Sequence, residues 1–223
     1  MSKFIVKHGE ILVQAFFRSP MFSLLDPPGS RFHSVMFANF GRYGLTVGDV
    51  RIENGLPNLS DGNITYNLSI LKATIKVFLD RIEVTFFDTP HVQRAIVNEV
   101  FEKAMKSVEE IAPGTQMREF MVAVSLHGLI DGEATSEYIS SFISRVPLGI
   151  APNAGQGVVF YYRGNEKAKG SSLVLDLSAR VIDGLYFRIS FTWDGLKVSG
   201  SELASLVETS FDDACDNIGL QLE

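Results

Sequence analysis

Apolar residues recur at helical spacing in two long runs, one in the middle of the chain and one near its end. In the first run, apolar positions are separated by three or four residues from Val92 to Val108, and in the second from Leu206 to Ile218. This spacing is typical of a helix that buries one face. The sequence therefore predicts two long amphipathic helices, in which Phe101 and Phe211 lie on the buried faces.

Both runs begin with residues that favour the start of a helix. Thr89 is a suitable N-cap, and Pro90 suits the first helical position. Ser199 precedes the second run, and Glu202 three residues later completes a capping box. Gly219 follows the second run, where a glycine commonly ends a helix. These signals predict one helix that ends just before the midpoint of the chain and another that ends close to its last residue.

The two runs match one another when about 110 residues are added to each position. The equivalent pairs are Ile96 and Leu206, Phe101 and Phe211, Ala104 and Ala214, and Met105 and Cys215. Upstream segments correspond with one-residue slips, 10–18 matching 119–127 and 64–69 matching 173–178. A nearly constant offset over ordered segments indicates an internal repeat, with units at residues 1–112 and 113–223. The alternative is that two unrelated α+β halves share generic patterns.

Alternating apolar and polar residues predict strands between the helices. The alternation is clearest in Ile75–Leu79 and Leu185–Trp193, which is typical of a sheet with one buried and one exposed face. Strands are expected over about 10–18, 43–53, 63–71, 73–79 and 81–87 in the first unit, and 119–127, 156–163, 172–181, 185–193 and 196–198 in the second. Further helical segments are expected at about 30–40 and 135–146. The expected fold class is therefore α+β, with an antiparallel sheet and a long C-terminal amphipathic helix in each unit.

The element order β-α-β-β-β-β-α, expected twice in tandem, resembles the TATA-binding-protein-like fold. In that fold two repeats join their sheets into one curved surface, and the helices pack on its convex side. The resemblance rests on element order without a sequence motif, and it implies a saddle with a broad exposed sheet face. A helix-grip arrangement, in which a sheet wraps one long helix around a ligand cavity, is the alternative. Neither fold by itself implies DNA binding.

The charge distribution separates this chain from the DNA-binding members of that fold. Those members read the minor groove with basic residues and insert phenylalanines between base steps. Here residues 1–111 carry no net charge, so residues 112–223 carry the whole net charge of −6. A nucleic-acid binder normally presents a basic face to the phosphates. We therefore expect no nucleic-acid partner.

The composition is that of an ordinary globular protein. Apolar residues make up 46% and charged residues 21% of the 223 residues, which is close to the globular average. Cys215 is the only cysteine, so an intrachain disulfide and a cysteine-based zinc cluster are both excluded. No run approaches the roughly 18 apolar residues of a membrane span, and the N-terminus lacks the apolar region of a signal peptide. We expect a cytoplasmic protein with no membrane partner.

No motif for catalysis, cofactor binding or metal binding stands out in the sequence. The four histidines, His8, His33, His91 and His127, are not spaced to share a metal ion. We therefore expect no metal and no cofactor. His127 falls at a predicted strand end near Asp131, which is more typical of a surface pair than of an acid–base catalyst. No catalytic residue can be assigned from the sequence.

Aromatic and arginine side chains on one predicted strand form the candidate binding surface. If the apolar positions of that strand face the core, Tyr161 and Arg163 point outward together, and Trp193 ends a neighbouring strand. Such residues are enriched at binding hot spots. Core filling and edge packing explain the aromatic residues equally well. We predict that Tyr161, Arg163 and Trp193 lie near a ligand or a subunit interface.

Charged residues elsewhere leave two interpretations open. Asp176, Arg180 and Arg188 fall inside or beside predicted strands, where they either line a polar pocket or cover the solvent side of the sheet. We favour the second interpretation. A cluster of aspartates on the second helix, Asp212, Asp213 and Asp216, either forms a solvated acidic face or meets a cationic partner.

These features favour a non-enzymatic ligand-binding or protein-interaction module that uses an exposed sheet face. The expected partner is a protein or a small ligand, and a homodimer is one option. The alternative is an enzyme whose active site is assembled from dispersed residues, since such a site leaves no motif in the sequence. Enzymatic activity stays undecided at this level.

Overall fold

The structure is a computed structural model that describes residues 1–24, 30–53, 62–87, 94–143, 157–164 and 166–223. Its strands are β1 (Ser2–Phe17), β2 (Val50–Glu53), β3 (Asn63–Leu68), β4 (Ala73–Phe78), β5 (Arg81–Phe87), β6 (Met117–Ile130), β7 (Val158–Arg163), β8 (Ala168–Leu177), β9 (Leu185–Asp194) and β10 (Leu220–Leu222). Its α-helices are α1 (Ser30–Phe40), α2 (Arg94–Ile111), α3 (Thr135–Ser140) and α4 (Gly200–Asn217). Short 3-10 helices are η1 (Phe22–Leu24), η2 (Gly41–Tyr43), η3 (Val47–Asp49) and η5 (Ser69–Leu71).

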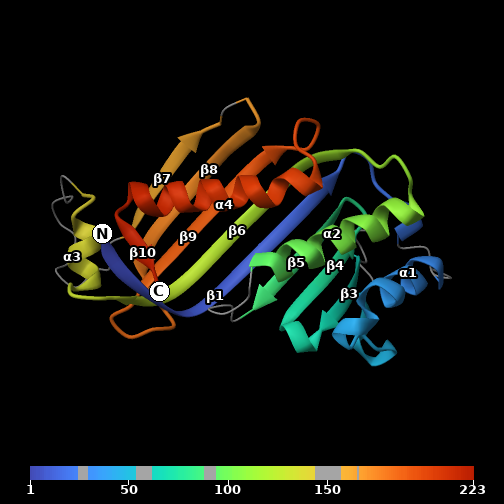
Figure 1. Ribbon diagram of the computed structural model, residues 1–223, viewed down its shortest axis with the longest axis horizontal. Helices are drawn as coiled ribbons and strands as arrows, with labels where there is room; N and C mark the ends of the chain where they lie inside the picture. Colours follow the sequence, from blue (N-terminus) through green and yellow to red (C-terminus); the bar gives the residue numbers. More distant parts are fainter. Residues whose placement is uncertain (25–29, 54–61, 88–93, 144–156, 165) are drawn as a thin grey trace.

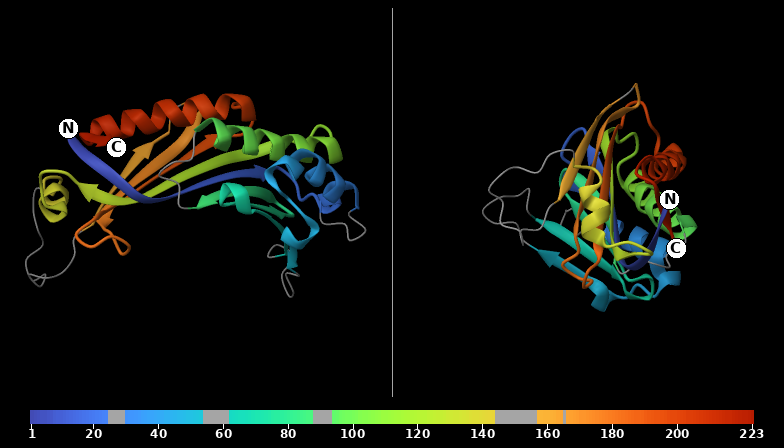
Figure 2. Two further views of the ribbon diagram at one scale, coloured as in Figure 1. Left: turned by 60° about the horizontal axis from the view of Figure 1, so that its bottom comes forward. Right: turned by 90° about the vertical axis from the view of Figure 1, so that its left-hand side faces the viewer.

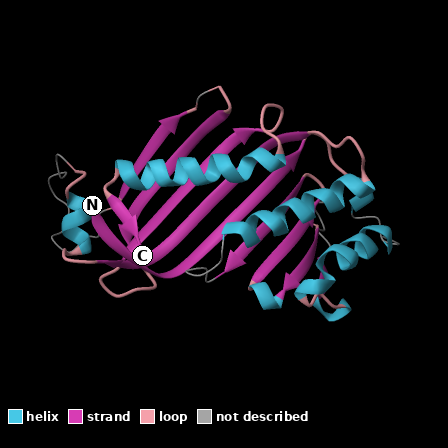
Figure 3. Ribbon diagram, viewed as in Figure 1, coloured by secondary structure: helices cyan, strands magenta, loops and turns pink. Residues whose placement is uncertain are grey.

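The described strands form one sheet, shown in magenta in Figure 3. Their order is β2-β3-β4-β5-β1-β6-β9-β8-β7, and β10 pairs in parallel with the start of β1. At the centre, β1 and β6 lie antiparallel over almost their whole length, from Phe4 opposite Ile130 to Phe17 opposite Met117. The two halves of the chain therefore build the two sides of one continuous sheet. The α+β class and the large antiparallel sheet agree with the prediction from the sequence.

The two longest helices, α2 and α4, cover the same face of this sheet (Figures 1 and 2). In the left view of Figure 2 the sheet bends away from the helices toward both ends, so the uncovered face is concave. This uncovered face is called the open face below. α1 packs beside α2 and buries Phe32, Met36 and Phe40. The ring of Phe32 meets Tyr66 of β3 edge-on, with 6.2 Å between ring centroids.

Each long helix inserts a phenylalanine between itself and the sheet, as the apolar periodicity predicts. Phe101 of α2 is 4% exposed and Phe211 of α4 is 8% exposed. The Phe101 ring meets Phe120 of β6 edge-on at 6.2 Å, and the Phe211 ring meets Phe187 of β9 at 5.9 Å. Cys215 of α4 is also buried.

The predicted capping box of the second helix is confirmed. Ser199 Oγ accepts the backbone N–H of Glu202 at 3.3 Å, and the Glu202 carboxylate accepts the backbone N–H of Ser199 at 2.9 Å. Gly219 follows the helix with φ of +69°, a left-handed conformation that favours glycine because it has no Cβ. The proposed start of the first helix, Thr89 and Pro90, lies outside the described residues.

Several predicted strand bounds were wrong. β1 and β6 begin at Ser2 and Met117, earlier than expected, and the expected strand at 43–53 shrinks to β2 because 3-10 helices occupy 41–43 and 47–49. Residues 196–198 form a turn, since the N–H groups of Lys197 and Val198 both donate to the Asp194 carbonyl. The last strand is instead β10, whose three residues are too few to show an alternating pattern.

Two other expectations meet the structure in different ways. The helix expected at 135–146 ends at Ser140, and part of that range lies outside the described residues. The division of the chain at 112/113 falls between α2 and β6. It stays a prediction, because the strands on both sides of the division belong to one sheet.

Within the described ranges, no helix is both long and apolar enough to span a membrane.

Candidate functional site

Strict alternation along β9 places its apolar residues under the helices and its polar residues on the open face. Leu185, Phe187 and Ile189 are at most 1% exposed, whereas Tyr186 and Arg188 alternate with them. Successive side chains of a strand point to opposite faces, so the buried set fixes the direction of the polar set. The same rule applies to β6 and β1, which bring further polar residues next to those of β9.

A polar cavity of about 190 Å³ opens among these residues. Its lining comes from β1, β6, β9 and the turn that precedes β9: Glu10, Leu12, Ala123, Ser125, His127, Arg180, Tyr186 and Arg188. The strand register explains the grouping, because Glu10 lies opposite Ser125 and Ser125 lies opposite Arg188. These three residues therefore form one row across the centre of the sheet. We call this cavity and its lining the anion pocket, for reasons of charge given below.

A second row of the anion pocket contains His127, which lies opposite Tyr186. Their rings are 4.8 Å apart between centroids, with an angle of 30° between their planes. This is close to a stacked arrangement. The stacking partner and the strand backbone together restrict the rotation of the imidazole.

A hydroxyl group determines which nitrogen of His127 carries the proton. Ser178 Oγ lies 2.9 Å from His127 Nδ1, and it accepts the backbone N–H groups of Arg180 and Val181 at 3.1 and 2.9 Å. These two donors occupy the lone pairs of the hydroxyl oxygen. The hydroxyl proton is therefore donated to Nδ1, so His127 accepts at Nδ1 and keeps its own proton at Nε2. The Nε2–H group is then available as a donor.

The surroundings of His127 favour its neutral form. Burial lowers the pKa of His127 below its ordinary value, and the positive charge of Arg180 and a contribution from His8 lower it further. Burial penalises the charged form of an imidazole, and nearby cations do the same. An anion bound beside His127 would oppose both causes and raise its pKa.

Two arginine side chains give the anion pocket its charge. Within the described part of the chain, neither the Arg180 nor the Arg188 guanidinium forms an ion pair with a carboxylate. The lining contains two arginines and one glutamate, which gives it a formal net charge of +1, in a chain whose net charge is −6. Guanidinium groups bind carboxylate and phosphate through paired hydrogen bonds. The arrangement therefore suits an oxyanion.

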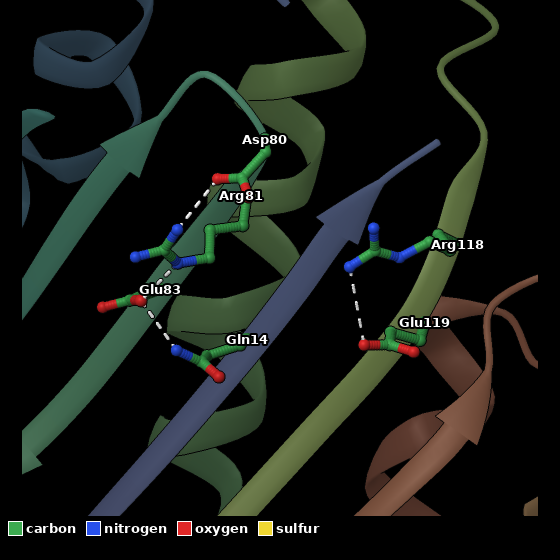
Figure 4. A network of polar contacts seen from close by, with 6 residues as sticks. All are labelled: Gln14, Asp80, Arg81, Glu83, Arg118 and Glu119. Atoms are coloured by element: carbon green, nitrogen blue, oxygen red, sulfur yellow. Dashed lines mark hydrogen bonds and ion pairs between the residues drawn. The ribbon is translucent and has the colours of Figure 1, made fainter. Parts of the chain in front are cut away.

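A second polar cluster on the open face differs from the anion pocket, because its arginine is paired with carboxylates (Figure 4). Arg81 of β5 donates from Nε to Glu83 Oε1 at 2.7 Å and from Nη1 to Asp80 Oδ1 at 2.9 Å. Gln14 of β1 donates to the same Glu83 oxygen at 2.6 Å. The Arg81 guanidinium also lies 3.8 Å from the centre of the Phe78 ring. We call Gln14, Asp80, Arg81 and Glu83 the Arg81 network, and in it the positive charge of Arg81 is already compensated by two carboxylates of the protein.

The structure does not bring the three predicted binding residues together. Tyr161 is 82% exposed and Arg163 is exposed, both on edge strand β7. Trp193 is only 2% exposed and packs against Phe191, 5.3 Å away between ring centroids. It belongs to the buried set of β9, on the face opposite Tyr161. The expectation that Trp193 shares a surface with the other two is corrected for this reason.

Other expectations for polar residues also change. The partner of His127 is Ser178 and not Asp131. Arg180 and Arg188 line a polar pocket, whereas we favoured the interpretation that they cover the solvent side of the sheet. That interpretation is wrong for these two residues. Asp176 is not part of the lining, and its carboxylate accepts the backbone N–H of Leu177 at 2.7 Å.

The described residues contain no group of three or more histidine, cysteine, aspartate or glutamate side chains arranged to hold a metal ion. His91 lies outside the described residues.

Sequence reasoning missed the residues that complete the anion pocket. Glu10, Ser125 and Tyr186 lie on three strands that are far apart in the chain, and Ser178 contacts His127 from the segment before β9. A signal was present for part of the group, because polar residues in β6 and β9 alternate with buried ones and must share a face. The register between β1 and β6 was not predictable from either strand alone, and it is this register that adds Glu10.

Comparisons with known proteins add little. No family model matches this sequence, and no curated protein matches it either. Among solved structures, a rolling circle replication initiator protein from Geobacillus stearothermophilus is similar, with 9% sequence identity, 93% of this chain and 80% of that chain covered, and a TM-score of 0.34.

This finding goes against the interpretation of the chain as a non-enzymatic ligand-binding or protein-interaction module. The similar structure is named for a role in initiating replication, so that interpretation is corrected and is not carried forward. A TM-score of 0.34 supports no function for this chain in its place. The function therefore has to be argued from the anion pocket itself.

Proposed function

We propose that the anion pocket binds the phosphate group of a hydroxyl-bearing phosphate monoester. The observation that carries this proposal is the convergence of Arg180 and Arg188, neither paired with a carboxylate of the described residues, on one cavity. The proposal concerns the anion pocket alone. It does not use the exposed aromatic residues of β7.

The size of the anion pocket restricts the ligand. Pockets for drug-sized molecules have volumes of roughly 300–1,000 Å³, whereas this cavity has about 190 Å³. It accommodates a compact oxyanion and a short attached group. The rest of a larger ligand would lie outside, against the open face.

The two ends of the anion pocket differ in charge, and this favours a particular ligand. Arg188 lies on β9, and Glu10 lies on β1, with Ser125 of β6 between them in register. The guanidinium end suits phosphate oxygens, and the carboxylate end accepts a hydrogen bond from a hydroxyl group. Sugar phosphates and nucleoside monophosphates carry both groups. The 5′-phosphorylated end of an oligonucleotide carries them too, so the ligand source has to be separated by experiment.

The test is a calorimetric titration with ribose 5-phosphate, inorganic phosphate, a nucleoside 5′-monophosphate and a short 5′-phosphorylated oligonucleotide. We expect ribose 5-phosphate to bind, and Arg180→Gln and Arg188→Gln each to weaken binding at least tenfold. Arg163→Gln is the matched control, because Arg163 is an exposed arginine on the same face and outside the pocket. Equal losses in all three variants, or no binding of any probe at millimolar concentration, would contradict the proposal.

The oligonucleotide arm also tests the expectation of no nucleic-acid partner. If the phosphate group alone is recognised, the oligonucleotide binds no more tightly than the nucleoside monophosphate. If the oligonucleotide instead binds much more tightly than the nucleoside monophosphate, and its affinity falls steeply with salt concentration, the protein contacts further phosphates. That outcome would assign the anion pocket to a nucleic acid.

We also propose that the chain is an internal duplication with a TATA-binding-protein-like arrangement. Outward from the centre, the strand orders β1-β5-β4-β3 and β6-β9-β8-β7 support this, because in each half the first strand lies beside the strand that precedes the long helix. The nearly constant offset of about 110 residues in the sequence supports it as well.

A test of the duplication is a circular permutant opened at residues 112–116. Cooperative folding is expected if the two halves are equivalent units, and failure to fold would count against them.

A further inference from the structure

A second cavity lies on the other side of the sheet, between α2 and α4. Its volume is about 290 Å³. Figure 1 shows β1 and β6 passing beneath the space between the two helices, and the cavity lining includes Val13 of β1 and Val122 and Val124 of β6 as its floor. Phe101 and Phe211 line it from the two helices. We call this cavity the helix groove.

The walls of the helix groove are apolar at depth and acidic at the rim. Its charged lining residues are Glu102 of α2, Glu208 of α4 and Glu223 near the end of β10. Among the described residues, no lysine, arginine or histidine lines it. An apolar site with one sign of charge around it concentrates ligands of the opposite sign.

One carboxylate of the rim already has a cationic partner in the protein. Lys3 Nζ lies 2.6 Å from Glu223 Oε1, and this interaction is the main cause of the raised pKa of Lys3. The exposed acidic surface continues along α4 through Asp212, Asp213 and Asp216. Because Glu223 is paired with Lys3, the charge that favours a cationic ligand comes from Glu102, Glu208 and the neighbouring aspartates of α4.

From this geometry we infer that the helix groove binds a small amphipathic amine, with its apolar tail against the valine floor and its ammonium group at the glutamate rim. The volume of about 290 Å³ is at the lower end of the range for small-molecule pockets. It suits a short alkyl or aryl chain better than a helix of another protein, which would need a longer groove. This site is independent of the anion pocket, because it lies on the opposite face and takes the opposite charge.

The test compares octylamine, octanol and octanoate, which share a tail and differ in the head group. At pH 7 and low salt, we expect octylamine to bind at least tenfold more tightly than octanol, and octanoate to bind more weakly than octanol. The double variant Glu102→Gln with Glu208→Gln should remove the preference for the amine while octanol still binds. Equal binding of the three probes by the unaltered protein would overturn the inference.

A second variant tests the location of the tail. Ala204 of α4 lines the helix groove and is half-buried, so Ala204→Phe should fill the space and weaken octylamine binding at least tenfold. Ala204→Leu, a smaller change, replaces it if circular dichroism shows that the phenylalanine variant is unfolded. Octylamine binding that neither substitution weakens would overturn the inference. So would sedimentation showing a dimer that Ala204→Leu dissociates, because a second copy of the chain would then occupy the groove.

Discussion

Both halves of the chain place arginine side chains on the same face of one sheet, but these arginines differ in whether a carboxylate pairs with them. In the first half, the Arg81 guanidinium meets Asp80, Glu83 and the Phe78 ring. In the second half, Arg180 and Arg188 line a cavity without a carboxylate partner among the described residues. An arginine whose charge is compensated within the protein contributes to stability, whereas uncompensated arginines in a cavity cost stability and suit a ligand. The difference favours a structural role for the Arg81 network and supports the proposed binding role of the anion pocket.

On the helix side the two halves are more alike. Phe101 and Phe211 each close the space between a long helix and the sheet, but their partners differ, since Phe101 of the first half meets Phe120 of the second. α2 therefore packs across the junction of the two halves. This contact joins them into one core and predicts that they unfold together.

The largest expected effect concerns this shared core. Phe101→Ala and Phe211→Ala should each reduce the free energy of unfolding by about 3–5 kcal/mol, because each leaves a cavity in a packed interface. Urea titration should show a single transition for both variants. Ile182→Ala is the control, since that side chain is 90% exposed and should change stability by less than about 0.5 kcal/mol. Two separate transitions in either variant would show that the halves are independent.

The core was predictable from the sequence to a useful degree. The apolar stripes of α2 and α4 and the alternation of β9 identified the buried residues. Apolar side chains that recur with the period of a helix or a strand lie on one face, and that face is buried. Short or irregular elements were not predictable: β10 has three residues, and the segment before β2 folds into 3-10 turns that carry no apolar pattern. Propensity has little weight in segments of this length.

The candidate site was less predictable than the core. Its residues come from three strands and a turn, and only the sheet register brings Glu10, Ser125 and Arg188 into one row. Trp193 illustrates the reverse error, because an aromatic residue at a strand end suggests a surface site. Yet its alternation with Leu185, Phe187, Ile189 and Phe191 already placed it among the buried residues. Periodicity was the better guide than residue type.

The next effect tests the contrast between the two arginine clusters directly. Glu83→Gln should reduce the free energy of unfolding by about 1.5–3 kcal/mol, because it breaks charge-assisted hydrogen bonds of a side chain that is 15% exposed. Arg188→Gln should leave the free energy of unfolding unchanged within about 0.5 kcal/mol or raise it slightly. Urea titrations in phosphate-free buffer provide both values. A larger loss in Arg188→Gln than in Glu83→Gln would reverse the assignment of the two clusters.

A smaller effect concerns the pH dependence of anion binding. A bound anion favours protonated His127, so affinity should rise as pH falls through the lowered pKa of this residue. Sulfate is the suitable probe, because it stays dianionic in this range whereas phosphate esters take up a proton near pH 6. The other charged or titratable side chains around His127 are Arg180, Arg188, His8 and Glu10. We expect several-fold tighter sulfate binding at pH 5.5 than at pH 7.5.

A substitution identifies the group responsible. His127→Gln keeps a hydrogen-bonding side chain that does not titrate, so its sulfate affinity should vary little between these pH values. His8→Gln is the matched control and should keep most of the dependence. A flat profile in the unaltered protein would show that the anion does not approach His127.

The smallest expected effect compares the two partly buried histidines through stability. His33 of α1 lies 2.8 Å from the hydroxyl of Tyr66 through its Nδ1, and Tyr66 is fully buried. Burial raises the pKa of Tyr66, so its hydroxyl keeps its proton. Burial also lowers the pKa of His33. The unfolded chain then binds more protons than the folded protein as pH falls from the ordinary histidine pKa of about 6.5 toward the lowered value, so stability must fall in that window.

The measurement is the urea midpoint between pH 7.5 and pH 5, above the range in which most carboxylates titrate. His127 contributes in the same direction, because its pKa is lowered as well. His33→Gln and His127→Gln should therefore each flatten the loss of stability, and the double variant should remove most of it. Since the two residues lie in different halves and share no contact, their effects should add. A double variant as sensitive to acid as the unaltered protein would show that neither histidine is held neutral by the fold.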